Sequence, residues 1–306
     1  MKILLVIVFV IAEVSVLAQT GSEIFLFDLK EKKGKLILSN PKNITDHIGY
    51  DNQPSFHAEK PIIYYSSFNE DGRSDIKIYN YKTGERKSLT QTTDREYSPT
   101  LTPDQKFVSC IIQRDNGGQD LGKYPVDGGQ PTVLIDNLIV GYHRWVDADR
   151  VLLFVLGEPQ TLHVYNVKTK EDRTVDDKIG RSLHAIPTRK SMSYVKKTSA
   201  TDWSIMELDM ATLSAKKLIG TLPGREDLCW TLNGRIIMSD GSKIYSIDPA
   251  KETVWSEMTV LSGAEKLKGV TRLAINSKSD KLAVVVSEWF WPVDVWVLNY
   301  VDLPPL

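Results

Sequence analysis

The chain has 306 residues and a formal net charge of −1, with 42% hydrophobic and 25% charged residues. These values are ordinary for a globular protein with a packed core, and the near-zero charge excludes a general attraction to nucleic acid or to an anionic membrane. The length would allow two domains, but a repeat protein can fill it with one.

Residues 1–18 have the pattern of a secretory signal peptide. An apolar run follows the early positive charge of Lys2, and the expected cleavage site lies after Ala18. Glu13 interrupts the apolar run, which is too short to span a bilayer, and no other stretch is apolar enough to do so. The mature protein, residues 19–306, is therefore expected to be periplasmic or secreted and to have no integral membrane segment.

A repeat of four short strands organises the mature chain. Between Tyr97 and Leu134, runs with strand composition alternate with turn residues. The third strand of this unit has an apolar-polar-apolar signature that recurs every 39 to 45 residues, starting at Tyr79, Tyr124, Tyr165, Leu208 and Ile247. This spacing is typical of four-stranded β-propeller blades.

Six inner strands are expected, and each begins a blade. They lie near residues 52–56, 97–101, 142–146, 182–186, 227–231 and 270–275. The blades cover about 52–90, 96–135, 141–175, 181–219, 226–257 and 269–300. Residues 23–38 read as a third and an outer strand without an inner strand before them. The predicted fold is thus an all-β, six-bladed propeller of four-stranded antiparallel blades, whose ring is closed by the N-terminal strands.

The last blade has a competing interpretation. Residues 294–298 also read as a third strand, and two segments cannot occupy one position. Either the N-terminal strand moves outward, or the tail 288–306 lies on the surface. Four aromatic residues of this tail either pack on the closing blade or form an exposed contact surface: Trp289, Phe290, Trp291 and Trp296.

The motifs of the second blade resemble the WD40-like repeat of the TolB-type propellers. They are the Pro103-Asp104 turn, the Gly-rich loop 114–120, the strand that ends at Val126 and the turn 127–129. The first blade repeats this skeleton. The resemblance implies an architecture rather than an activity. TolB proteins carry an α/β domain ahead of the propeller, which this chain is expected to lack, so binding roles of that domain are not carried over.

Common catalytic signatures are absent from the sequence. It has no Gly-x-Ser-x-Gly elbow, phosphate-binding loop, His-Glu-x-x-His helix or Cys-x-x-Cys pair. Its Asp-Gly pairs are explained by turns in which glycine adopts a positive φ. Cys110 and Cys229 fall in different blades, which favours buried free thiols over a disulfide.

Two histidines form the best candidate for a chemical site. His143 and His184 occupy equivalent positions on inner strands of adjacent blades, and His57 follows the first inner strand. Neutral imidazoles so placed can ligate a transition metal, or one can act as a general base. Oligogalacturonide lyases have related repeats and use histidine-held manganese, so this resemblance implies manganese as a cofactor. A metal needs three or four ligands, however, and the alternative is partly buried histidines bonded to neighbouring backbone.

Charged side chains gather at the starts of the inner strands. We expect them near the channel mouth: Asp51, Arg95, Glu96, Arg181, Arg225, Glu226, Asp227 and Arg272. They either form a polar funnel for carboxylated sugars, peptides or a partner's loop, or pair with one another to join blades. Aromatic residues that recur at matching strand positions are expected in the core between blades, with a sugar-stacking platform as the alternative: Tyr64, Tyr65, Tyr79, Trp145, Tyr165 and Trp230.

Two functions remain open on this basis. The first is a cofactor-free, monomeric binding or scaffolding module that holds a protein or glycan partner in the cell envelope at one propeller face. The second is a metal-assisted lyase or hydrolase that acts on acidic oligosaccharides at the channel, with His143 and His184 as its catalytic residues. Fold alone does not choose between them.

Overall fold

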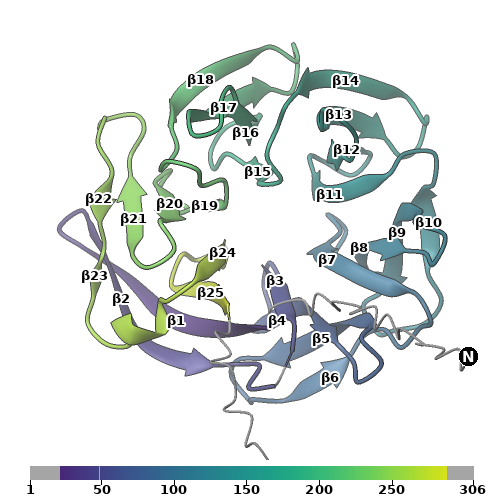
Figure 1. Ribbon diagram of the computed structural model, residues 1–306, viewed down its shortest axis with the longest axis horizontal. Coiled ribbons are helices and arrows are strands. Elements are labelled where there is room, and N and C mark those ends of the chain that lie inside the picture. The colour runs from purple at the N-terminus through teal and green to yellow at the C-terminus, as the bar shows by residue number, and fades with distance from the viewer. Residues whose placement is uncertain (1–20, 48, 288–306) are drawn as a thin grey trace, which may run out of the picture.

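The computed structural model describes residues 21–47 and 49–287, which form six β-sheets around a central axis (Figure 1). The expected signal peptide and the tail 288–306 lie outside the described residues. One short 3-10 helix, η1 (Ala264–Lys266), is the only helix in the described part. In that part no helix is long and apolar enough to cross a membrane.

Each of the first five blades is a four-stranded antiparallel sheet whose strands follow chain order from the channel outward. Blade 1 contains β3 (Asp51–Phe56), β4 (Ile62–Phe68), β5 (Ser74–Asn80) and β6 (Arg86–Ser88). Blade 2 contains β7 (Arg95–Leu101), β8 (Phe107–Gln113), β9 (Gln119–Pro125) and β10 (Thr132–Ile135). Blade 3 contains β11 (Val140–Trp145), β12 (Arg150–Val155), β13 (Thr161–Asn166) and β14 (Asp172–Asp177). Blade 4 contains β15 (His184–Ala185), β16 (Ser191–Lys197), β17 (Trp203–Asp209) and β18 (Ala215–Gly220). Blade 5 contains β19 (Leu228–Trp230), β20 (Ile236–Ser239), β21 (Ile244–Ile247) and β22 (Ser256–Glu257).

The sixth blade joins the two ends of the described chain. Its strand order is β24 (Val270–Ile275), β25 (Lys281–Ser287), β1 (Ser22–Lys32), β2 (Lys35–Asn43) and β23 (Thr259–Val260). β1 pairs antiparallel with β25 from Ser22↔Ser287 to Asp28↔Lys281. The predicted fold class and the closure by the N-terminal strands are confirmed. The competing segment 294–298 lies outside the described residues, and the fifth strand, β23, which pairs parallel with β2, was not predicted.

The core lies between the blades. The second strand of a blade is apolar along most of its length because both of its faces are covered, as in β8 and β12. Two tryptophans of inner strands also hydrogen-bond to the preceding blade: Trp145 Nε1 donates to Ser109 Oγ at 2.9 Å, and Trp230 Nε1 donates to Ser193 Oγ at 2.9 Å. The prediction that the recurring aromatic residues pack between blades is therefore confirmed.

Bulges bend the inner strands beside the channel. The register of β3 shifts between Asn52 and Ser55, and that of β7 shifts between Tyr97 and Thr100. Gln53 (φ 57°) adopts a left-handed conformation in the first bulge, and its Oε1 accepts a hydrogen bond from the backbone N–H of Ser98 at 2.7 Å. Because a bulge re-aims side chains, these shifts set which groups face the channel.

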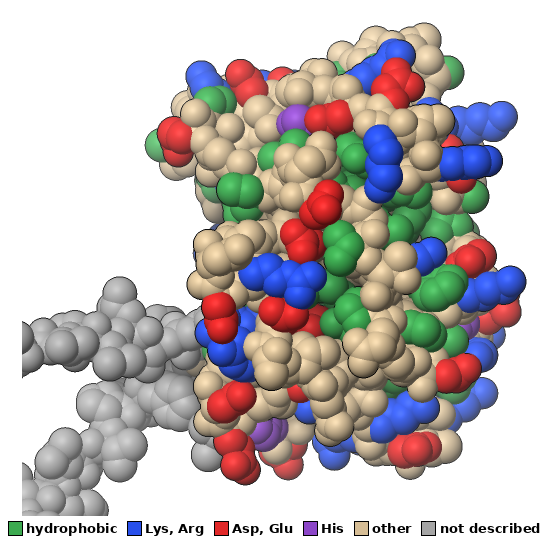
Figure 2. All heavy atoms as spheres, turned by 90° about the vertical axis from the view of Figure 1, so that its right-hand side faces the viewer, with side chains coloured by type: hydrophobic (Ala, Val, Ile, Leu, Met, Phe, Trp, Pro, Cys, Tyr) green, Lys and Arg blue, Asp and Glu red, His purple; other side chains and the backbone are tan. Residues whose placement is uncertain are grey.

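The two cysteines are free and buried, as predicted. Burial raises the pKa of both thiols, so they are inert. On the flank of the ring drawn in Figure 2, basic and acidic side chains are interspersed. This flank therefore offers no field of one sign to attract a charged partner.

Candidate functional site

Three cavities follow one another along the channel, in the direction of the inner strands. The narrow mouth is a cavity of about 160 Å³ at the strand starts, lined by Arg181, Arg225, Glu226, Asp227, Ser239, Thr271 and Arg272 among others. The mid-channel cavity, of about 130 Å³, contacts all six inner-strand segments. The wide mouth, of about 570 Å³, lies at the strand ends. Ligands that reach one cavity thus approach the next.

Arginine and aspartate form a connected cluster at the narrow mouth. Arg181 Nη2 lies 2.7 Å from Asp227 Oδ2, and Arg272 Nη1 lies 3.6 Å from Asp227 Oδ1. Arg272 Nη2 also donates to Tyr142 Oη at 2.7 Å, and its guanidinium lies over the Tyr142 ring. Although burial alone would lower the pKa of Arg181, the Asp227 carboxylate outweighs this effect and raises that pKa. One carboxylate is therefore shared by two permanently charged arginines.

Glu226 is also held by Arg181, whose Nε lies 3.8 Å from Glu226 Oε1. Its Oε2 accepts from the backbone N–H of Arg181 at 2.9 Å and lies 3.1 Å from Lys197 Nζ. Arg225 is exposed and, among the described residues, pairs with no carboxylate. Arg181, Arg225 and Arg272 at the mouth thus outnumber its two carboxylates, and the mouth carries positive charge.

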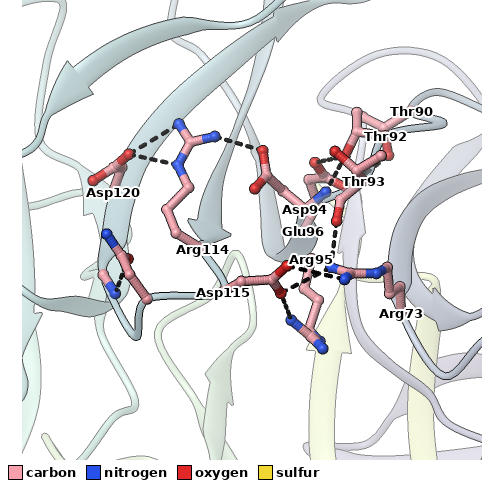
Figure 3. A network of polar contacts seen from close by, with 12 residues as sticks. Arg73, Thr90, Thr92, Thr93, Asp94, Arg95, Glu96, Arg114, Asp115 and Asp120 are labelled. Carbon is pink, nitrogen blue, oxygen red and sulfur yellow. Dashed lines mark hydrogen bonds and ion pairs between the residues drawn. The ribbon is translucent and has the colours of Figure 1, made fainter.

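Arg95 and Glu96 lie in another network, between blades 1 and 2, and not in the narrow mouth (Figure 3). Asp115, in the loop after β8, accepts from Arg95 Nη1 at 3.0 Å and from Arg73 Nη1 at 3.1 Å. Arg73 precedes β5 and also donates to the carbonyl of Thr93. These contacts join neighbouring blades. For Arg95 they match the alternative in which the charged residues pair with one another instead of forming a polar funnel.

Glu96 is fully buried next to this network. Its Oε1 accepts from Thr92 Oγ1 at 2.6 Å and from Tyr124 Oη at 2.9 Å. Burial raises the pKa of Glu96 to about 7, although these two hydrogen bonds oppose the rise and Asp75 adds to it. Glu96 therefore titrates near neutral pH inside the protein.

Asp51 is also buried, and it lines a separate cavity of about 730 Å³ on the flank of blade 1. Its Oδ2 lies 3.5 Å from His47 Nδ1. Burial raises the pKa of Asp51 to about 6, and the contact with His47 opposes the rise. Asp51 is thus not one of the residues that the structure brings together at the narrow mouth.

His143 and His184 both line the mid-channel cavity, whereas His57 lines the wide mouth. His143 Nε2 lies 2.7 Å from Ser109 Oγ, and His184 Nε2 lies 3.0 Å from Ser182 Oγ. Burial, with a smaller effect of the Arg144 charge, lowers the pKa of both His143 and His184 to about 3. Both rings are therefore neutral at physiological pH.

These histidines do not fit a bound metal. Across residues 21–47 and 49–287, no group of three or more His, Cys, Asp or Glu side chains is placed to hold a metal ion. His57 Nδ1 accepts from the backbone N–H groups of Glu59 and Lys60 at 3.1 Å, so that nitrogen is occupied. The guanidinium of Arg144, close enough to depress the pKa of both other histidines, would repel a divalent cation.

No known family model matches the chain, and no curated protein does. Its structure matches a protein assigned as TolB from Agrobacterium tumefaciens with a TM-score of 0.68 at 10% identity, over 89% of this chain and 100% of the other. It also matches TolB from Acinetobacter baumannii with a TM-score of 0.55 at 13% identity, over 88% of this chain and 64% of the other. The fold is that of the TolB propellers. At such low identity the likeness concerns the fold alone.

A manganese complex of oligogalacturonate lyase matches the same TolB-type propeller with a TM-score of 0.57 at 14% identity, over 89% of this chain and 99% of the other. This match also shows a shared fold and no more. In the described residues, no α/β domain accompanies the propeller.

Three residues at or beside the channel were not predicted: Tyr142 and Arg144 line it, and Lys197 pairs with Glu226. The signal for Arg144 was its place between His143 and Trp145 on an inner strand, where a charged side chain must face the channel or be paired. Tyr142 and Lys197 gave no such signal because their partners come from other blades.

Proposed function

We propose that this TolB-type propeller is a binding module that holds an acidic group of a partner protein at the narrow mouth. The observation that carries the proposal is the excess of arginine over carboxylate among five charged residues that distant segments bring to one mouth. A guanidinium presents paired donors that match a carboxylate, so arginine suits recognition of acidic groups.

Two groups at the mouth are available to a ligand. Arg225 is exposed without a carboxylate partner among the described residues, and the Thr271 hydroxyl is buried without a hydrogen-bond partner there. The Arg181–Asp227 pair keeps Arg272 in position beside Tyr142. An incoming carboxylate would bind Arg225 and the N–H groups of Arg272 that do not contact Asp227 or Tyr142. Thr271 would hydrogen-bond to the same ligand.

The cellular setting follows from the signal-peptide pattern of residues 1–18. It supports a protein of the periplasm or the secreted fraction with a partner in the cell envelope. An acidic glycan is the other ligand that this mouth fits. The metal-assisted lyase receives less support, because Arg144 lies beside the two histidines that would have to hold the metal.

The first test measures binding of two acidic probes by isothermal titration calorimetry: an acetyl-tetra-aspartate amide peptide and trigalacturonate. We expect the peptide to bind, and Arg272→Met to weaken it about tenfold or more, because a charge-assisted hydrogen bond is lost. Added salt should also weaken peptide binding by the wild type, because it screens the attraction between the arginines and the acidic peptide.

Arg173→Met is the matched control, since Arg173 is exposed on β14 and, of the residues that the structure describes, pairs only with Glu171. It should leave binding unchanged. Stronger binding of trigalacturonate than of the peptide would indicate that the partner is a glycan and not a protein. If neither probe binds, or if Arg272→Met binds like the wild type, the narrow mouth is not the binding site.

A further inference from the structure

The wide mouth differs in chemistry from the narrow one. Its lining mixes apolar and aromatic side chains with uncharged polar ones, and among the described residues Arg144 is the one Arg, Lys, Asp or Glu that lines it. The indoles of Trp145 and Trp230 are fixed by their hydrogen bonds to Ser109 and Ser193. Trp145 is half-buried and Trp230 is almost fully buried, so both indoles are held in place, and binding costs little entropy to order the parts of them that the mouth exposes.

Arg144 lies at the inner end of this mouth, where it also lines the mid-channel cavity. Within the described part of the chain it has no hydrogen-bond or ion-pair partner, although Arg181 and Arg272 nearby are both paired. Burial lowers the pKa of Arg144, and no neighbouring carboxylate offsets this. Arg144 is only half-buried, so its guanidinium is accessible from both cavities, and an anion bound there would form a charge-assisted pair with it.

His143, the preceding residue, has a ring nitrogen without a hydrogen-bond partner among the described residues. Ser109 Oγ donates to the carbonyl of Thr100 at 3.0 Å and accepts from Trp145 Nε1, so its remaining lone pair accepts from His143 Nε2. When the Ser109 hydroxyl donates to Thr100, the His143 proton lies on Nε2, and Nδ1 is an acceptor. This Nδ1 is buried and has no partner in the described structure. His143 Nδ1 can therefore accept a hydrogen bond from a ligand in the mid-channel cavity, which Arg144 also lines.

We propose that the wide mouth binds an amphiphilic carboxylate, with its acid group on Arg144 and its apolar or aromatic body against Trp145 and Trp230. The volume of about 570 Å³ is within the usual range for a small-molecule or peptide-end site. A donor next to the carboxylate, either a hydroxyl or a bridging water, completes His143 Nδ1. Two sources carry this chemistry: the C-terminus of an apolar peptide and a free organic acid. This site is separate from the narrow mouth, and its test does not depend on whether the narrow mouth binds a partner.

The test compares acids with their amides by isothermal titration calorimetry. The peptide arm uses acetyl-Trp-Leu-Phe with a free C-terminal carboxylate and the same peptide as a carboxamide. The small-acid arm uses hydrocinnamate and hydrocinnamide. We expect the acid of at least one arm to bind about tenfold or more tightly than its amide, because only the acid forms a charge-assisted pair with Arg144. The arm that binds identifies the source.

Arg144→Met keeps the length of the side chain and removes its charge. It should abolish the preference for acid over amide, whereas Arg272→Met, at the other mouth, should retain it. The melting temperature of Arg144→Met should equal or exceed that of the wild type, since the side chain that is replaced forms no ion pair with the described residues and is only half-buried. A purely structural arginine would instead lower the melting temperature when replaced.

Three results would overturn the proposal. They are equal binding of acids and amides, an acid preference that survives Arg144→Met, and absence of binding in both arms. A melting temperature of Arg144→Met clearly below that of the wild type would also count against it, because it would show that Arg144 stabilises the ring.

Discussion

Phe27→Ala is expected to lower the free energy of unfolding by about 3–5 kcal/mol, since removal of a fully buried aromatic side chain leaves a cavity. Phe27 lies on β1, has no exposed surface, and packs in one cluster with Leu282 and Val284 of β25 and with Met258. The mutation therefore weakens the contact between the N-terminal strand and the end of the described chain. Urea denaturation measures the loss directly.

Val254→Ala is the control for this prediction. Val254 is 73% exposed, and its truncation should change stability by less than about 0.5 kcal/mol. If Phe27→Ala were no more destabilising than this control, β1 would not be the strand that closes the ring.

Glu96→Gln is expected to alter how stability depends on pH. The pKa of Glu96 rises from 4.5 to about 7 in the folded protein, so the folded chain retains a proton that the unfolded chain releases between these values. The wild type therefore loses stability from this residue as pH rises through that window. Glutamine cannot ionise. The stability of Glu96→Gln relative to wild type should thus increase by about 2–4 kcal/mol between roughly pH 5 and pH 8.

The comparison has to be made between variant and wild type. His143 and His184 titrate with the opposite sign, since their pKa is lowered and the unfolded chain takes up their protons below about pH 6.5. Their effect cancels in the difference. Glu85→Gln, at an exposed position, should follow the wild-type pH profile. If the stability of Glu96→Gln varied with pH in parallel with that of the wild type, Glu96 would be ionised in the folded protein across this whole pH range.

The sequence was sufficient to predict the blades because their physical cause is local. Turn residues and apolar runs repeat every 39 to 45 residues. Residues 23–38 read as strands without an inner strand before them, so they had to join the sheet of another blade. The bulges in β3 and β7 could not be predicted. They depend on contacts between blades, such as the hydrogen bond from the Ser98 N–H to Gln53 Oε1.

The candidate site was predictable only in part, because neighbouring side chains on a strand point in opposite directions. Charges at the strand starts were expected at the channel, and Arg181, Asp227 and Arg272 do line it. Glu96 instead points between blades toward Tyr124. That Arg144 lacks a partner among the described residues depends on side chains from several blades, so the sequence of its own strand does not show it.

The central claim is that the channel accepts anionic groups, and anomalous diffraction from crystals soaked in bromide tests it most directly. Bromide scatters strongly and binds where positive charge is accessible and unpaired. We predict a bromide peak at the narrow mouth in contact with Arg225, which is exposed and has no carboxylate partner among the described residues. Bromide on the outer surface, with none in the channel, would contradict the claim.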